Sequence, residues 1–255
     1  MIAPWAAKDA HSAYPPHVHP SPPLGEHDVH VWTTRLNATP SQIESLGSTL
    51  SQDEHERAGR FRFERHRAAF VAARAALRGI LGGYLGIAPR LVLFEYGPYG
   101  KPGLATGSLQ FNAAHSGDLV VVGVTRRHRI GVDVEHRREL EYLALAEHFF
   151  APPEITDLHS LPDGERPDGF FNCWTRKEAY VKALGEGLSF PLDQFAVTLR
   201  PGMAPALLWS SHGSAESSRW EILNVSSEPD YIGAVVVERP VGQVVALRWG
   251  QNDRR

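Results

Sequence analysis

The sequence predicts an α/β (α+β) protein with two similar lobes, each built of helices packed on an antiparallel sheet. Its 255 residues are 42% hydrophobic and 22% charged, which is typical of a globular chain with one large or two small cores. Helix-like periodicity is followed by short β-branched runs separated by turn signals. This succession occurs twice, with a boundary near Ile130, although residue identity does not demonstrate a repeat.

The N-terminal end is predicted to be a mobile tail. Residues 1–24 are rich in Pro and His and show neither helical nor strand periodicity. The pairs His17/His19 and His27/His30 are weak candidates for metal ligands, because exposed histidines in such segments usually bind nothing.

The predicted N-terminal lobe spans residues 25–129. It begins with DVHVWTTRL, where apolar and polar residues alternate as in a half-buried strand. Ser51 is a predicted N-cap, and a long helix is expected over Phe61–Leu85 with arginines on one face. The following segment GPYGKPGLATGS is predicted to be a loop because Gly and Pro dominate it.

Two apolar runs meet at the boundary between the lobes. Leu119–Thr125 and Ile130–Glu135 are both rich in β-branched residues and are joined by the basic turn RRHR. This pattern predicts an antiparallel hairpin.

The predicted C-terminal lobe spans residues 130–250. Helices are expected over Glu141–Phe150, in a segment restarting after the prolines at 152 and 153, and over Phe170–Leu184. The remainder predicts a series of short strands, in the segments FAVTLR, ALLWSS, RWEILNV, YIGAVVVE and QVVALRW.

The bulk composition argues against several classes of protein. A net charge of −3 does not favour a nucleic-acid binder. The segment from Arg57 to Arg78, however, contains many arginines and one acidic residue, Glu64, and is predicted to form a local basic surface. A lone cysteine cannot form an internal disulfide, so a cytoplasmic location is expected. No apolar run approaches the roughly 20 residues of a membrane helix, and the start lacks a signal-peptide pattern.

Two carboxylates stand in the segment GVDVE. In a strand, Asp133 and Glu135 share one face while Val132 and Val134 face the core. Two acids on one face repel unless a cation joins them, and oxygen ligands suit Mg²⁺. An exposed strand end would explain the same residues, so the pair alone is weak evidence.

The helix in WTRKEAYVKALGEGL carries a second cluster. Trp174, Glu178 and Lys182 lie on one stripe at steps of four, with Lys177 adjacent. A surface salt bridge would explain the helix alone. Beside GVDVE, Glu178 becomes a candidate metal ligand or base, and the lysines become candidate phosphate contacts.

These two segments, in this order and about forty residues apart, resemble the signature of the Sfp-type 4′-phosphopantetheinyl transferases. The segment KPGL resembles the K-P loop of the family, and FNAAHSG resembles its F-N-x-S-H-S segment. The arginine-rich helix from Arg62 is similar to the family's cofactor-binding helix. The resemblance spans roughly residues 61–192, and it implies two lobes in a pseudo-twofold arrangement with the active site between them.

The resemblance implies that coenzyme A donates its phosphopantetheine arm to a serine of an acyl or peptidyl carrier protein. Asp133, Glu135 and Glu178 would hold Mg²⁺, with Mn²⁺ also possible. Glu178 would help remove the serine proton, and Lys182 would stabilise charge on the phosphate.

The resemblance also implies the contacts to coenzyme A, a co-substrate with three phosphate groups. The predicted cofactor-binding residues are Arg65, Arg74, Lys101, Pro102, His115 and Lys177. The family commonly has a serine before the histidine, and here Ala114 lacks that hydroxyl.

The expected partners are coenzyme A and a carrier protein, with no nucleic acid and no membrane, and the chain is expected to be a monomer. The basic surface between Arg57 and Arg78, or the loop before Phe170, is a candidate docking site for the carrier. Two other interpretations stay open, namely a non-catalytic coenzyme A or nucleotide-binding module and a metal-dependent phosphate-ester hydrolase.

Overall fold

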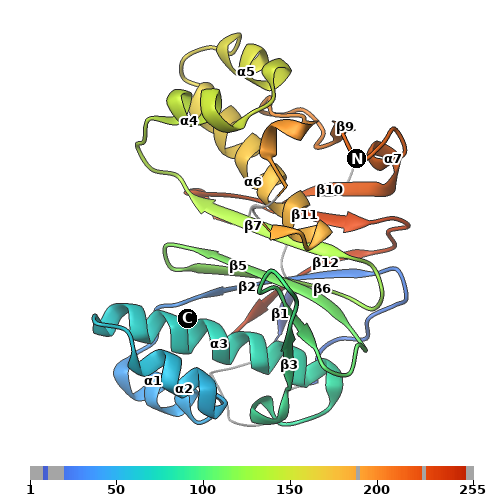
Figure 1. The fold of residues 1–255 in the computed structure, drawn as a ribbon. Coiled ribbons are helices and arrows are strands. Elements are labelled where there is room, and N and C mark those ends of the chain that lie inside the picture. The colour runs from blue at the N-terminus through green and yellow to red at the C-terminus, as the bar shows by residue number, and fades with distance from the viewer. Residues whose placement is uncertain (1–7, 11–19, 188–189, 226–227, 251–255) are drawn as a thin grey trace.

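The computed structural model describes residues 8–10, 20–187, 190–225 and 228–250. A long helix, a five-stranded sheet, a three-stranded sheet and a second long helix follow one another as layers (Figure 1). The mixed α/β class is therefore confirmed. His17 and His19 lie outside the described residues.

The first sheet has the strand order β1-β12-β2-β6-β5. Its strands are β1 (Lys8–Ala10), β12 (Val244–Trp249), β2 (Val29–Arg35), β6 (Leu119–Thr125) and β5 (Gln110–Ser116). The helices on its outer side are α1 (Pro40–Gly47), α2 (Gln52–Gly59) and α3 (Glu64–Leu85), followed by the 3₁₀ turn η1 (Pro89–Leu91).

The second sheet has the order β10-β11-β7, and all its pairs are antiparallel. Its strands are β10 (Trp220–Val225), β11 (Tyr231–Glu238) and β7 (Ile130–His136). The helices of this half are α4 (Tyr142–Phe149), α5 (Pro152–His159), α6 (Arg166–Leu184) and the short α7 (Glu216–Arg219). Two small sheets pair β3 (Phe94–Tyr96) with β4 (Pro102–Leu104), and β8 (Phe195–Val197), which follows the turn η3 (Leu192–Gln194), with β9 (Leu207–Ser210).

The predicted hairpin between β6 and β7 is wrong, because the two strands belong to different sheets. β6 pairs with β2 and β5, and β7 pairs with β11. Valines from both strands meet in one core between the two sheets, where Val121 lies in the same cluster as Val132 and Val134. Both strands are apolar enough to lie in two sheets that pack face to face. The turn signal between them does not distinguish this arrangement from a hairpin.

The sheet pairing differs from the predicted boundaries at both ends of the chain. The C-terminal strand β12 joins the first sheet, parallel to β2, instead of the sheet of the second half. Lys8–Ala10, within the predicted tail, pairs with β12. Leu24 is buried, and Ser21 donates backbone and hydroxyl hydrogen bonds to carbonyls of α3. A sheet edge needs a partner, and these distant segments supply it.

Several elements differ in extent from their predictions. β2 is buried on both faces for most of its length instead of half-buried. Pro102–Leu104 forms a strand within the predicted loop, and α6 begins four residues before Phe170. The five predicted C-terminal strands are confirmed, as is the Ser51 cap, whose backbone N–H donates to Glu54.

Helix α3 packs on the first sheet and is partly apolar. By length and composition alone it could cross a membrane, but half of the relevant window is buried inside the protein. Leu77, Ile80 and Leu81 pack against residues of β2, β6 and β12. The burial fits the core helix of a layered fold.

Helix α6 lies unusually close to β7 at one glycine. A Cβ atom built on Gly131 would lie 1.9 Å from the carbonyl oxygen of Ala179 and 2.3 Å from the backbone nitrogen of Ala183. Both obstacles are backbone atoms, so no side-chain rotation could relieve the clash. The absence of a side chain at Gly131 therefore sets the distance between helix and sheet.

We expect Gly131→Ala to lower the free energy of unfolding by about 2 kcal/mol or more, because the helix must move away from the strand. Urea denaturation of this variant beside Gly164→Ala measures it, since a Cβ on Gly164 meets nothing within 4 Å. Equal midpoints for the two variants would show that the contact at Gly131 does not constrain the fold.

Candidate active site

Strand β7 and helix α6 bring four charged side chains to one pocket. Val132 and Val134 point into the core between the sheets, so Asp133 and Glu135 face α6. Glu178 and Lys182, one turn apart on α6, line the same pocket of about 780 Å³. The predicted convergence of these four residues is confirmed.

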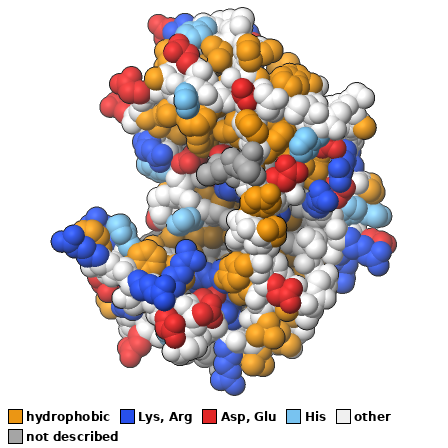
Figure 2. All heavy atoms as spheres, viewed as in Figure 1, with side chains coloured by type: hydrophobic (Ala, Val, Ile, Leu, Met, Phe, Trp, Pro, Cys, Tyr) orange, Lys and Arg blue, Asp and Glu red, His pale blue; other side chains and the backbone are white. Residues whose placement is uncertain are grey.

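The rest of the pocket wall is mostly apolar and comes from two segments. Besides Trp174 on α6, it consists of His148, Phe149, Phe190, Pro191, Leu192 and Asp193. Figure 2 shows the surface hollowed between the part of the molecule built on α3 and the part built on α6. The sequence analysis missed all of these except Trp174, because no local pattern shows that α4 and the segment after α6 approach the acids.

Asp133 is a buried carboxylate with one satisfied oxygen. Its Oδ1 accepts a hydrogen bond from Lys182 Nζ at 2.6 Å, while its Oδ2 is buried and has no hydrogen-bond partner. Burial raises the pKa of Asp133 to about 7; Lys182 opposes this rise, and Glu178 and Glu135 add to it. Burial therefore favours the protonated form of Asp133 more than in an exposed aspartate.

Glu178 and Glu135 have different surroundings. Burial raises the pKa of Glu178, Lys182 lowers it, and the charge of Glu135 raises it further. Glu135 Oε2 accepts a hydrogen bond from the hydroxyl of Ser116 at 2.9 Å and faces Arg138 at 3.4 Å. Glu178 is thus suited to accept a proton, and Glu135 is held in place by β5.

The donor set fits a divalent cation that prefers oxygen. Three carboxylates line one pocket, and Asp133 Oδ2 lacks the partner that a buried carboxylate oxygen normally has. Among the described residues, however, no three acids, histidines or cysteines lie close enough together to form a ready-made metal cluster. The ammonium of Lys182 instead supplies the positive charge beside Asp133.

His27 and His30 are not placed as a metal pair. His27 Nδ1 lies 2.9 Å from His128 Nε2 on the surface. His30 is buried, and its Nδ1 lies 2.6 Å from the Tyr84 hydroxyl, which also accepts a hydrogen bond from Trp32. Both histidines have protein partners in the fold.

The prediction that Lys177 contacts a cofactor is wrong. Its side chain is fully buried, forms a salt bridge of 2.6 Å with the buried Glu154, and donates to the carbonyls of Leu192 and Phe195. It lies one position off the stripe of Glu178 and Lys182, and this rotation directs it into the core behind α6.

Lys101 ties the two halves together. Its ammonium donates to the carbonyl oxygens of Ile130, at 3.0 Å, and of Lys182, in the last turn of α6. Burial and the nearby Arg129 lower the pKa of Lys101 to about 8. The C-terminal end of a helix favours a cation, so the lysine stabilises the end of α6.

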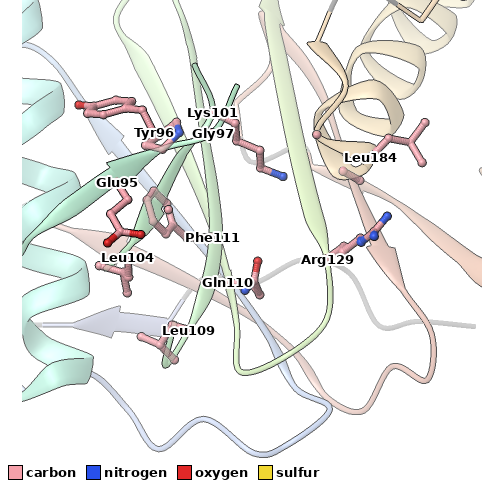
Figure 3. Close-up of a pocket in the computed structure, with 14 residues that line it drawn as sticks. Glu95, Tyr96, Gly97, Lys101, Leu104, Leu109, Gln110, Phe111, Arg129 and Leu184 are labelled. Atoms are coloured by element: carbon pink, nitrogen blue, oxygen red, sulfur yellow. The ribbon is translucent and has the colours of Figure 1, made fainter. Parts of the chain in front are cut away.

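Lys101 and Pro102 also line a second pocket, of about 420 Å³, between β4, β5 and the end of α6. Figure 3 shows Lys101, Gln110 and Arg129 around it, with Leu184 at the end of α6. The predicted K-P loop therefore does reach the junction of the halves, and both of its residues remain candidate contacts.

The other predicted cofactor-binding residues lie outside both pockets. Arg74 is largely buried, and its Nε donates to Glu54 at 2.7 Å, so Glu54 already occupies this guanidinium. The buried Arg78 donates to the same carboxylate. Arg65 and His115 are exposed. Arg74 and Arg78 are therefore not part of an exposed basic surface, because Glu54 of helix α2 pairs with both of them.

Two family profiles match consecutive parts of the chain. The profile of the 4′-phosphopantetheinyl transferase superfamily matches residues 129–236, and that of the N-terminal part of 4′-phosphopantetheinyl transferases matches residues 34–126.

Curated relatives match over most of the chain. The 4′-phosphopantetheinyl transferase HetI of a Nostoc species is 40% identical over 226 residues, which are 86% of this chain and 92% of that protein. The transferase psf-1 of Bacillus pumilus is 31% identical, over 78% and 83% of the two chains. The transferase ffp of Bacillus subtilis is 30% identical, over 78% and 87%.

Removal of Lys177 should destabilise the protein strongly. Lys177→Met leaves the buried carboxylate of Glu154 without its countercharge, which costs about 3–5 kcal/mol in the free energy of unfolding. The double variant Lys177→Met/Glu154→Gln removes that charge and should recover part of the loss in urea denaturation. A Lys177→Met variant with the stability of the parent chain and a raised KM for coenzyme A would instead return Lys177 to the ligand site.

The stability of the metal-free protein should depend on pH through Asp133. The pKa of this carboxyl rises from its usual value of 3.8 to about 7 in the folded protein. Between these two pH values the folded chain therefore binds more protons than the unfolded chain. The contribution of Asp133 to the free energy of unfolding therefore falls as pH rises through that window.

Urea denaturation in EDTA measures this dependence as the difference between the parent chain and Asp133→Asn at each pH. From pH 4 to pH 7, the free energy of unfolding of the parent chain should fall relative to that of Asp133→Asn. Asp230→Asn, at an exposed position, serves as the control. A difference that does not change with pH would contradict the raised pKa.

Proposed function

The chain belongs to the 4′-phosphopantetheinyl transferase family of the Sfp type, and from this premise we propose how its own residues carry out the transfer. The enzyme moves the phosphopantetheine arm of coenzyme A to a serine hydroxyl of a carrier protein. In this reaction a bond forms between the serine oxygen and the β-phosphorus of coenzyme A. The bond from that phosphorus to the bridging oxygen breaks, and adenosine 3′,5′-bisphosphate leaves.

One observation supports placing the reaction in the pocket between β7 and α6. Asp133 has a buried oxygen without a partner, and Lys182 and Glu178 stand beside it on a single helix. A surface salt bridge would expose these groups to solvent, whereas here burial dominates the electrostatics of both carboxyls. Such clusters of perturbed groups in a pocket are typical of catalytic sites.

Asp133, Glu135 and Glu178 would hold a divalent cation, Mg²⁺ or Mn²⁺. When bound, it would neutralise pyrophosphate charge and increase the electrophilicity of the phosphorus. The orphaned oxygen of Asp133 and the all-carboxylate donor set support this assignment.

Glu178 is the proposed general base for the serine hydroxyl. Its burial and the negative charge of Glu135 both favour proton uptake, which a base requires. Lys182 is proposed to donate a hydrogen bond to a phosphate oxygen whose negative charge grows in the transition state. To do so, its ammonium must exchange Asp133 Oδ1 for the phosphate oxygen.

The proposed contacts to coenzyme A come from a subset of the predicted cofactor-binding residues. Lys101 and Pro102 line the pocket at the junction of the halves, and Arg65 and His115 are exposed to solvent. Arg74 can contribute only by sharing its guanidinium with Glu54. Fewer residues are available than the sequence predicts.

The carrier is proposed to be an acyl or peptidyl carrier protein that meets a monomeric enzyme in the cytoplasm, without nucleic acid or membrane. The alternative of a binding module without chemistry does not explain why three carboxylates and Lys182 converge. A phosphate-ester hydrolase would use the same acids on water, and only the fate of the arm separates it from a transferase.

Intact-mass analysis of an apo carrier protein incubated with coenzyme A, Mg²⁺ and the enzyme tests the proposal. We expect the phosphopantetheine mass on the carrier, its loss in EDTA, and a rate reduced at least about 100-fold in Glu178→Gln, as for loss of a general base. Glu44→Gln, at an exposed position of α1, is the matched control.

Three outcomes would contradict parts of the proposal. A Glu178→Gln enzyme as fast as Glu44→Gln would remove Glu178 from the reaction. An unmodified carrier together with released phosphopantetheine would indicate hydrolysis. Coenzyme A binding without any product, across acyl and peptidyl carriers, would favour the binding module.

A further inference from the structure

Arg176, on the same helix as Glu178, is buried without a countercharge. Its side chain is 1% exposed, and no carboxylate of the described residues lies within salt-bridge distance. Its Nη1 donates to the carbonyl and hydroxyl oxygens of Thr198, and its Nη2 donates to Asn224 Oδ1 at 2.9 Å. A guanidinium held only by neutral acceptors is an uncompensated positive charge, which is unfavourable in a protein interior.

The Nε of Arg176 also has no hydrogen-bond partner. In the described part of the chain, the buried side-chain atoms in this condition are Asp133 Oδ2 and Arg176 Nε. Asp133 lines the pocket assigned to the reaction. Arg176 lines a different pocket, and a native protein rarely leaves such a donor unsatisfied without a reason.

The pocket at Arg176 has a volume of about 200 Å³ and lies between the first half of α6 and the ends of β10 and β11. Its charged residues are Arg137, Asp168 and Arg176, which leave one net positive charge. Arg137 and Asp168 are both partly exposed and form a salt bridge of 3.2 Å. The negative charge is therefore already paired, and Arg176 is the cation in excess.

Neutral donors in the same pocket complete the site. Asn224 also lines it and accepts from Arg176 through its oxygen, so its amide nitrogen remains a donor. Asn172 lines the pocket and has one N–H beyond the hydrogen bond that it donates to the carbonyl of Leu199. Arginine and amide donors around a small cavity match an oxyanion.

We propose that this pocket binds a small oxyanion of the size of phosphate, with Arg176 as its countercharge. The site is distinct from the reaction pocket. The two pockets share no lining residue, and positions 176 and 178 point to different sides of α6. The proposal does not depend on the transfer reaction, because it rests on the uncompensated charge of Arg176 and on the amide donors that line the same pocket.

Thermal unfolding in increasing inorganic phosphate, at constant ionic strength set with sodium chloride, tests the site. Phosphate that binds only the folded chain raises the unfolding midpoint. We expect a rise in the parent chain and in Arg90→Met, an exposed arginine on η1, and no rise from this site in Arg176→Met. Sulfate and acetate in place of phosphate distinguish a tetrahedral from a carboxylate ligand.

The comparison of the parent chain with Arg176→Met isolates this pocket from phosphate bound near Lys182. Equal rises in both would overturn the proposal and leave Arg176 as a purely structural link between Thr198 and Asn224. If Arg176→Met does not fold, the arginine Nε–H resonances of the ¹⁵N-labelled parent chain replace it. The buried Arg176 resonance must move with phosphate, and an unchanged resonance would equally overturn the proposal.

Discussion

The close contact between α6 and β7 at Gly131 is the constraint on which the candidate active site depends. The helix backbone occupies the space where a side chain would stand, so the strand and the helix can lie this close only with a glycine at position 131. Asp133 lies two residues further along that strand, and Lys182, directly above, forms an ion pair with it at 2.6 Å. A larger separation would break this pair and move Glu178 and Lys182 away from Asp133 and Glu135.

The two halves are joined by two kinds of interaction. Valines of β6 and β7 form an apolar layer between the sheets, and Asn112 of β5 accepts the backbone N–H of Val132 at the free edge of β7. Lys101 adds a polar link from the β3–β4 segment to the end of α6. The pocket between β7 and α6 and the pocket in Figure 3 both border these contacts, so the junction fixes their walls relative to each other.

Neighbouring cations on α6 have different surroundings, because each points to a different side of the helix. Lys182 faces the pocket and shares the carboxylate of Asp133, while Lys177 is enclosed with Glu154 in the core. Arg176 is equally buried but has only neutral acceptors. Buried cations normally have a paired charge, so the exception at Arg176 indicates a ligand that the chain alone does not provide.

The sequence by itself determined most of the helices and strands and the residues that share one face at the candidate active site. The spacing of two in GVDVE and of four from Trp174 to Lys182 places side chains on one face through local geometry alone, and the structure brings these residues to one pocket. Tertiary structure decided the rest. Whether Lys177 or Arg74 meets a ligand or a buried acid depends on which distant segment covers it. The pairing of β12 with β2, and the separation of β6 from β7, depend on partners that no local pattern specifies.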